Sequence, residues 1–349
     1  MIDRKKTKRI QAGGVAIGGG EPITVQSMLS VPSTDIEGSV RQAAALEKAG
    51  CDLIRAAIPD RDALALIPAL KKAVRVPLVA DIHFDYRLAL AAAEAGIDKI
   101  RINPGNIGGS QRVKAVAELC RQNNIPIRIG VNSGSVEKEI LAKYGAPTPQ
   151  ALCESAMYHI KLLNQFDFDD IAVSIKSSDV MTTVEAYRLM SQMCDYPLHL
   201  GVTEAGTARM GLIKSAVGIG GLLSEGIGDT IRVSLTADPV EEVRAGKDIL
   251  KALGLAGGVR FISCPTCGRT RIDLIGLAQK AEAALVGCTK DITVAIMGCA
   301  VNGPGEAHEA DIGIAGGNGE GLIFKKGEVY KKVPEEQLLG ALLDEVEKL

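Results

Sequence analysis

Four cysteines gather in the last quarter of the chain, and three of them have a spacing that could hold a metal. Cys264 and Cys267 form a C-x-x-C pair directly after an apolar run. Cys299 follows in MGCAVNGPGEAHE, with Glu306 in the same Gly/Pro-rich turn. Cys288 precedes the next expected strand, so we expect it at the far end of that strand from Cys299. The sequence therefore offers three thiols and a carboxylate on two turns.

Three chemistries compete for this set. A zinc ribbon would normally show a second C-x-x-C pair, which is absent from this sequence. A redox dithiol at a helix start would leave the Cys299 turn unexplained. An iron–sulfur cluster with an oxygen ligand or an open iron suits three thiolates, since a weakly held iron can meet a substrate. Spacing alone leaves the cluster and zinc both open.

Cations interrupt segments that otherwise read as buried strands. Parallel strands covered on both sides are normally continuous runs of Val, Ile and Leu. Five such segments instead contain Arg55, Arg101, Arg128, Lys176 and Arg232. Two acidic residues near strand ends, Asp81 and Glu204, are the counter-charges that the sequence offers, so an excess of positive charge remains.

Two interpretations of this excess are possible. The cations could belong to an internally neutralised layer of ion pairs, or they could bind a phosphate or diphosphate, whose oxygens match arginine geometry. We predict the anion site, because ligands bind at the carboxyl ends of such strands. The expected polar lining is Gln26, His83, Asn132, His199 and Glu204, with backbone amides from NPGNIGG (103–109). A lone strand histidine such as His199 carries little weight, whereas Asp81 and His83 together in DIHFDYR carry more.

The elements that must position these side chains alternate between strand and helix. Strand-like segments begin at Ile23, Cys51, Val76, Lys99, Pro126, Ile171, Pro197 and Thr230, with amphipathic stretches between them. Eight such units predict a (β/α)8 TIM barrel rather than a doubly wound sheet. The glycine-rich AGGVAIGGGEP before the first strand predicts a hairpin at the barrel bottom. Segment 133–150 is either an extra helix or a loop over the mouth.

A glycine-rich linker, GLAGGV (254–259), divides the chain. We expect a TIM-barrel domain with the substrate site over residues 1–255 and a small α+β domain with the cluster over residues 256–349. The chain has 349 residues, 46% hydrophobic residues and a net charge of −2, which gives no global reason to expect nucleic-acid or membrane binding. The basic start lacks the apolar stretch of a signal peptide and no run is long enough to span a membrane, so we expect a cytoplasmic protein.

Several motifs together resemble one known family. ITVQSM, DIHFDYRLAL, RINPGN, RIGVN, GVTEAG, SCPTCGRT and GCAVNGPGEA are similar to segments of the bacterial 4-hydroxy-3-methylbut-2-enyl diphosphate synthases of the non-mevalonate isoprenoid pathway. The resemblance runs in order from about residue 7 to the C-terminus and fits the compact two-domain form. It implies an iron–sulfur oxidoreductase that opens and dehydroxylates 2-C-methyl-D-erythritol 2,4-cyclodiphosphate with two electrons.

The resemblance also implies roles for individual residues. The diphosphate would be bound by Arg55, Arg101, Asn103, Arg128, Asn132, Lys176, Arg232, Ser234 and Gln26. Asp81, His83 and Glu204 would lie near the reacting carbons, with Glu204 as first choice for proton donor and His83 as second. A 4Fe-4S cluster would be held by Cys264, Cys267, Cys299 and Glu306. An electron-donor protein, flavodoxin or ferredoxin, is the implied redox partner.

Chain connectivity predicts a homodimer. The eighth helix of a barrel ends at the face opposite the mouth, and a linker of six residues spans at most about 20 Å. The second domain would therefore cap the barrel of a partner copy rather than its own. Two other functions stay open from the residues: a pterin-diphosphate-type barrel enzyme with a structural zinc module, and an iron–sulfur electron carrier or redox regulator without a substrate.

Overall fold

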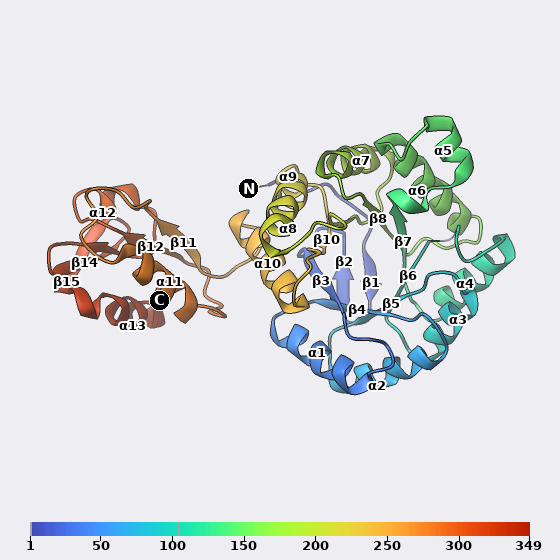
Figure 1. Ribbon diagram of the computed structural model, residues 1–349, viewed down its shortest axis with the longest axis horizontal. Helices are drawn as coiled ribbons and strands as arrows, with labels where there is room; N and C mark the ends of the chain where they lie inside the picture. Colours follow the sequence, from blue (N-terminus) through green and yellow to red (C-terminus); the bar gives the residue numbers. More distant parts are fainter. Residues whose placement is uncertain (1, 104) are drawn as a thin grey trace. The chain divides into compact units, whose positions relative to one another are not determined.

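The computed structural model describes residues 2–103 and 105–349, so Pro104 of the NPGNIGG segment lies outside the described residues. The chain divides into two compact units, Met1–Leu255 and Ala256–Leu349. Each unit has its own sheet (Figure 1).

The first unit is a parallel barrel surrounded by helices (Figure 1). Its strands are β3 (Thr24–Met28), β4 (Leu53–Ala57), β5 (Leu78–Asp81), β6 (Lys99–Ile102), β7 (Ile127–Asn132), β8 (Ile171–Lys176), β9 (His199–Leu200) and β10 (Thr230–Ile231). They neighbour one another in the order β8-β7-β6-β5-β4-β3-β10-β9. A parallel bridge between Val173 and Leu198 joins the two ends of this order. Each predicted strand segment contains one of these strands, and the predicted (β/α)8 architecture is confirmed.

Helices follow the strands, as the amphipathic stretches of the sequence predict. They are α1 (Ile36–Lys48), α2 (Leu66–Ala73), α3 (Tyr86–Glu94), α4 (Ser110–Gln122), α5 (Lys138–Tyr144), α6 (Pro149–Asn164), α7 (Val180–Met193), α8 (Ala208–Ser215), α9 (Gly221–Ser224) and α10 (Pro239–Ala252). Asp35 caps α1 by accepting a hydrogen bond from the Gly38 N–H, and Asp179 caps α7 in the same way through Thr182. Within the undecided segment 133–150, the structure has the extra helix α5.

The bottom of the barrel is closed by a hairpin, as the glycine-rich segment predicts. Strands β1 (Ile10–Ala12) and β2 (Val15–Ile17) pair antiparallel. Ile10, Ala12 and Ile17 pack against the inward-facing Leu53, Val79 and Ala172 of the barrel. This apolar floor excludes water from one end, so a ligand can approach the inward-facing side chains from the other end.

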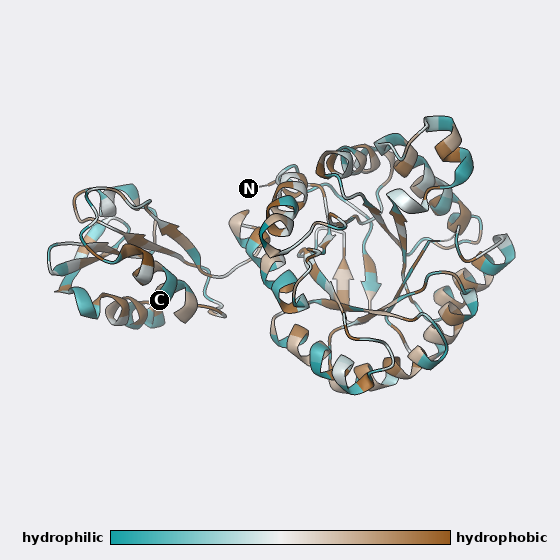
Figure 2. Cartoon of the chain, viewed as in Figure 1, coloured by the Kyte–Doolittle hydropathy of each residue, from teal (hydrophilic) through white to brown (hydrophobic). Residues whose placement is uncertain are grey.

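The second unit has a five-stranded sheet in the order β11-β12-β13-β14-β15. Its elements are β11 (Arg260–Ser263), α11 (Leu274–Ala284), β12 (Thr293–Met297), α12 (Gly303–Glu306), β13 (Ile312–Gly316), β14 (Glu320–Lys325), β15 (Glu328–Pro334) and α13 (Leu338–Lys348). The first three strands are parallel and the last two are antiparallel to their neighbours. Strands β12 and β13 are coloured as hydrophobic in Figure 2, as expected of central strands.

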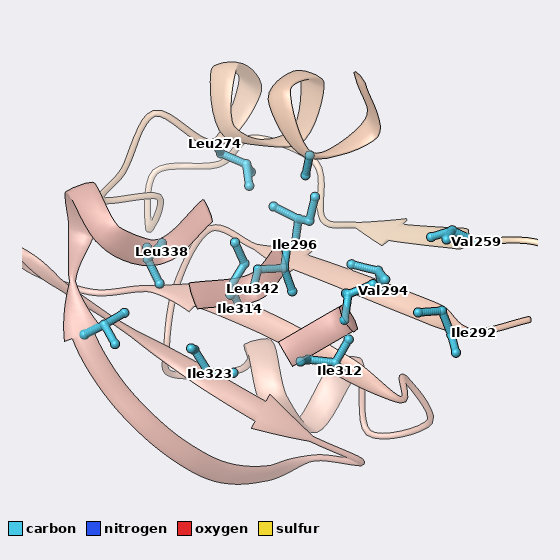
Figure 3. Close-up of a cluster of buried hydrophobic side chains, with 13 residues drawn as sticks. Val259, Leu274, Ile292, Val294, Ile296, Ile312, Ile314, Ile323, Leu338 and Leu342 are labelled. Atoms are coloured by element: carbon cyan, nitrogen blue, oxygen red, sulfur yellow. The ribbon is translucent and has the colours of Figure 1, made fainter. Parts of the chain in front are cut away.

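The alternation of side chains along β12 explains the packing of this unit. Val294 and Ile296 face α11 and α13, which contribute Leu274 and Leu342 to a buried apolar cluster (Figure 3). The intervening Ala295 lies on the opposite face, in a smaller cluster with Phe324. Both faces of the sheet are therefore covered, and the turns after β11 and β12 are left at one edge.

Candidate functional site

Six cationic side chains share the inward face of the barrel, and we call them the barrel cations. They are Arg55, Lys99, Arg101, Arg128, Lys176 and Arg232. Strand pairing explains their common direction, because paired residues of neighbouring strands point to the same face. Arg101 pairs with both Asp81 and Arg128 across β5, β6 and β7. The five predicted cations therefore come from β4, β6, β7, β8 and the end of β10 and face one interior, and Lys99 of β6 is a sixth.

Asp81 is the central carboxylate of this interior. One oxygen accepts from Arg55 Nη2 at 2.8 Å and contacts His83 Nε2 at 3.0 Å, and the other accepts from Arg101 Nη1 at 3.1 Å. Burial alone would raise the pKa of Asp81, but Arg55, His83 and Arg101 together hold it well below its usual range. Asp81 therefore stays ionised and orients three neighbouring side chains.

The second counter-charge is Glu242 on α10, not Glu204. Glu242 is buried, and its oxygens lie 3.4 Å from Arg232 Nε and accept hydrogen bonds from Ser27 Oγ and Leu235 N at 3.0 Å. Gly246 allows α10 to lie close to β3, because a Cβ there would stand 2.8 Å from Val25. The sequence contained a signal for Glu242, since it shares the buried stripe of α10 with Gly246, Ile249 and Leu250.

Arg128 is the least compensated of the barrel cations. It is 1% exposed, and none of its three guanidinium nitrogens has a hydrogen-bond partner among the described residues. Gln26 Nε2 and His199 Nε2 are also buried without partners among those residues. Buried polar atoms are normally satisfied. Unpaired donors in an inward-facing set indicate a place where an anionic ligand supplies the missing acceptors.

Charge crowding lowers proton affinity throughout the interior. Burial, and then the charges of Arg128 and Arg232, hold the pKa of Lys176 well below its usual value. Burial, followed by Arg128 and Lys176, does the same to the pKa of His199. A guanidinium remains protonated in proteins, so Arg128 keeps its charge and the lysines and histidine around it bear the effect. The interior repels protons and attracts anions.

Two glycines make room for the cations. A Cβ at Gly130 would stand 2.3 Å from Arg101 Nε, and a Cβ at Gly201 would stand 2.6 Å from Lys176 Nζ. A Cβ at either position would force the cation to move, because Arg101 and Lys176 lie across the backbone of neighbouring strands. The glycines are thus part of the site, and their role was not predicted from the sequence.

The remaining predicted residues occupy the mouth and its loops. Asn132 and Ser234 are half-buried on the inward face. Asn103 is buried, but it holds loops together: its amide donates to Ser135 O at 3.3 Å and its oxygen accepts from Gly105 N at 3.1 Å. Asn103 therefore ties together the loops after β6 and β7.

Glu204 is exposed in the loop after β9 and has a left-handed backbone, with φ of 52°. Such a conformation is strained for a residue with a Cβ. His83 is half-exposed above Asp81. Both proton-donor candidates therefore lie at the open end of the barrel.

The predicted cluster ligands lie on two adjacent turns of the second unit. Cys264 directly follows β11, and Cys299 lies just beyond β12, so parallel pairing of these strands brings the two turns to one edge. Cys264 Sγ accepts a hydrogen bond from Gly298 N at 3.1 Å. Arg271 N also donates to Gly298 O at 3.3 Å. The backbone next to Cys299 is thus tied to the C-x-x-C turn.

Arg269 interacts electrostatically with the other predicted cluster ligands. Hydrogen bonds from Arg269 lower the pKa of the Cys267 thiol, which favours the thiolate. A hydrogen bond with Cys267, followed by the charges of Cys267, Cys299 and Glu306, raises the pKa of Arg269. Within residues 2–103 and 105–349, no three Cys, His, Asp or Glu side chains stand close enough to hold a metal ion. The donor set, three thiols and a carboxylate on neighbouring turns, nevertheless fits an iron–sulfur cluster by its chemistry.

In the described part of the chain, no helix has the length and apolarity needed to cross a membrane.

Comparisons with known proteins cover both units. Residues 7–247 match the family described as the GcpE TIM-barrel domain, and residues 260–348 match the GcpE protein C-terminal domain. A protein of Clostridium perfringens named 4-hydroxy-3-methylbut-2-en-1-yl diphosphate synthase (flavodoxin) is 58% identical over 349 residues, 100% of each chain. One of the same name from Caldanaerobacter subterraneus subsp. tengcongensis is 59% identical over 347 residues, which cover 99% of this chain and 98% of the relative.

One solved structure resembles part of the chain in fold. A dihydropteroate synthase from Xanthomonas albilineans, solved with 7,8-dihydropteroate, aligns with a TM-score of 0.52 and 16% identity over 70% of this chain and 97% of its own. At that identity the likeness concerns the fold and carries no information on substrate.

Proposed function

The chain belongs to the GcpE family, and on that premise we propose that it converts 2-C-methyl-D-erythritol 2,4-cyclodiphosphate to (E)-4-hydroxy-3-methylbut-2-enyl diphosphate. The observation that carries the proposal is the barrel interior, where six basic side chains meet two carboxylates and Arg128 has no partner among the described residues. A cyclic diphosphate supplies the missing negative charge. The relatives named above carry the same activity in their names.

The barrel residues bind and orient the diphosphate. Arg128 and Lys176 bind phosphate oxygens directly, since neither has an acidic partner among the described residues. The other arginines each pair with a carboxylate and use their remaining N–H groups for the ligand; they are Arg55, Arg101 and Arg232. Gln26, Asn132 and Ser234 add neutral hydrogen bonds on the same inward face. Asp81 holds Arg55, Arg101 and His83 in place. Binding thus fixes the ring with its carbon skeleton toward the mouth.

The reaction removes one oxygen as water and opens the ring, and its balance requires two electrons and two protons. Cys264, Cys267, Cys299 and Glu306 would hold a 4Fe-4S cluster, which supplies electrons one at a time when bound. Glu204 donates the proton to the departing hydroxyl, and His83 is the alternative donor. Exposure of both groups at the mouth leaves them free to meet the substrate.

The test is anaerobic purification with iron and sulfide quantification, followed by reduction of the cyclodiphosphate with an artificial one-electron donor. We expect about four irons and four sulfides per chain and formation of the diphosphate product. Zinc without sulfide would instead support a structural metal module and would contradict the proposal.

A ligand-set variant sharpens this test. Glu306→Ala should retain part of the iron, because three thiolates remain, but should lose most turnover. Glu309→Ala is a matched control, since Glu309 is an exposed carboxylate in the same segment. Full turnover of Glu306→Ala would exclude Glu306 as a ligand.

We also propose a flavodoxin as electron donor, supported by the printed names of the relatives. Reduced flavodoxin should support turnover by the full chain. Turnover with reduced ferredoxin but not with flavodoxin would contradict this assignment.

A further inference from the structure

Lys99 is a buried lysine that the proposed reaction does not use. It is the first residue of β6 and is 1% exposed. Lys99 and Arg101 share the inward face of their strand, so Lys99 lies about 7 Å deeper, given a rise of about 3.3 Å per residue. Sequence reasoning treated Lys99 only as the start of a strand. The structure places an amine between the apolar floor and the layer of arginines.

The surroundings of Lys99 hold no carboxylate that is free to pair with it. Its hydrogen bonds and ion pairs found among the described residues include none to an acidic side chain, and Asp81 and Glu242 are already engaged by arginines. The hairpin below contributes only the apolar Ile10, Ala12 and Ile17. The ionisable groups of neighbouring strands that face this interior are Arg55, Asp81, Arg128, Lys176, His199 and Arg232.

Lys99 therefore lies among other positive charges, which disfavour its protonated form. Burial lowers the pKa of Lys99 to about 7, and the charge of Arg128 contributes to this effect. Arg128 cannot relieve the repulsion by losing its own proton. At pH 8 the amine is thus mostly neutral while the barrel is empty of anions, and that state removes the cost of burying a further unpaired charge.

We propose that Lys99 is a positioning residue that takes up a proton when the cyclodiphosphate binds. Anion binding in this barrel is then coupled to proton uptake. This inference rests on the proposed function. Phosphate oxygens that pair with Arg128 cancel the charge that keeps Lys99 neutral. An anion nearby also favours the charged amine directly. The protonated amine then supports the ligand-bearing layer from below, without contact with the reacting carbons.

The sign of the pH dependence follows from linkage. Binding raises the proton affinity of Lys99. The ligand affinity is therefore highest below pH 7 and falls as the pH rises from 7 toward the higher pKa that Lys99 has in the complex. The loss approaches tenfold per pH unit for one coupled proton. The ligand itself does not change protonation in this range, since each phosphorus of the cyclic diphosphate carries a single strongly acidic group.

The experiment is calorimetric titration of the full-length, cluster-loaded, oxidised protein with 2-C-methyl-D-erythritol 2,4-cyclodiphosphate, without reductant so that no turnover occurs. Titrations at pH 8 in two buffers of different ionisation enthalpy measure the protons taken up. We expect Lys99 to take up roughly 0.5–1 proton per bound ligand. Lys99→Met, which keeps the length and removes the amine, should lower the uptake by that amount and flatten the decline of affinity between pH 7 and 9.

Lys114→Met is the matched control, because Lys114 is half-exposed on the outer helix α4; its uptake should equal that of the unmodified protein. Binding without buffer dependence in the unmodified protein would overturn the inference whether or not the variant folds. Equal uptake in Lys99→Met and in the unmodified protein would also overturn it. Absence of any binding by the unmodified protein would instead overturn the proposed function, and with it this inference.

Discussion

Arg128 shows how a single residue can be unfavourable for stability and necessary for binding. Its guanidinium is buried, positively charged and without a hydrogen-bond partner among the described residues. An uncompensated buried charge costs several kcal/mol. The positive charges of Arg55 and Arg101 add repulsion to the cost of its burial. Its presence is explained by a ligand that compensates it.

Replacing Arg128 should therefore separate stability from binding. Arg128→Met should raise the thermal midpoint of the ligand-free protein, corresponding to about 1–4 kcal/mol of relieved charge burial. The same variant should lose most of its affinity for the cyclodiphosphate. Differential scanning calorimetry with and without ligand measures both effects, and a lower midpoint in the ligand-free variant would refute the uncompensated-charge interpretation.

Substitutions of Glu204 should separate an effect on stability from an effect on turnover. Its left-handed backbone, φ 52°, is unfavourable for a residue with a Cβ. Glu204→Gly should raise stability by about 1 kcal/mol through relief of that strain, and should abolish most turnover through loss of the carboxyl group. Glu204→Gln keeps the strain, so its stability should be unchanged while turnover also falls. Retained turnover in Glu204→Gln would assign the proton transfer to His83.

At the scale of elements, the close approach of neighbouring strands fixes the cations. Arg101 lies over Gly130 of β7, and Lys176 lies beside Gly201 after β9. The side chain on one strand thus depends on the absence of a side chain on the next. This dependence is a property of strand pairing and does not involve any charge on the glycine.

Gly130→Ala should displace Arg101 without altering the charge of the site, because the new Cβ would stand 2.3 Å from Arg101 Nε. We expect affinity for the cyclodiphosphate to fall about tenfold, equivalent to about 1.4 kcal/mol and within the usual range for a charged hydrogen bond. Gly134→Ala is the control, since a Cβ there meets nothing within 4 Å. Equal affinities of the two variants, measured by calorimetry, would refute the role of Gly130.

At the scale of the whole molecule, the proposed reaction needs a barrel and a cluster unit to meet. Helix α10 leads from the mouth end of β10 to the opposite end of the barrel, and residues 253–259 then connect it to β11. So short a segment spans at most about 25 Å. We therefore propose, as chain connectivity predicts, a homodimer in which each cluster unit serves the barrel of its partner.

Mixed dimers test this arrangement. Arg128→Met inactivates the barrel and Cys299→Ser inactivates the cluster unit, so each variant alone should be inactive. After co-expression or subunit exchange, half of the dimers contain one of each, and each such dimer has one intact pair in trans. Activity should recover to about a quarter of the unmodified value for a two-fold dimer. No recovery, with exchange verified by mass spectrometry, would show that each barrel uses its own cluster unit.

The sequence by itself determined the barrel, the basal hairpin and the inward cations. Eight strand–helix units and period-2 alternation depend on neighbouring residues, so they can be recognised locally. Motif resemblance likewise covered both units, and the GcpE family matches agree with it. The thiols of Cys264, Cys267 and Cys299 were found by spacing, whereas Cys51, Cys120 and Cys153 are single, buried residues.

Only the tertiary structure decided which charges compensate one another. Glu242 lies on the last barrel helix, yet it reaches Arg232, while Glu204 points into the open loop region without that role. Lys99 became conspicuous only once its depth and lack of an acidic partner were known. Gly130 matters through Arg101 on another strand. Pairing and burial join residues that are distant in the chain, and electrostatic energy depends on those distances rather than on sequence order.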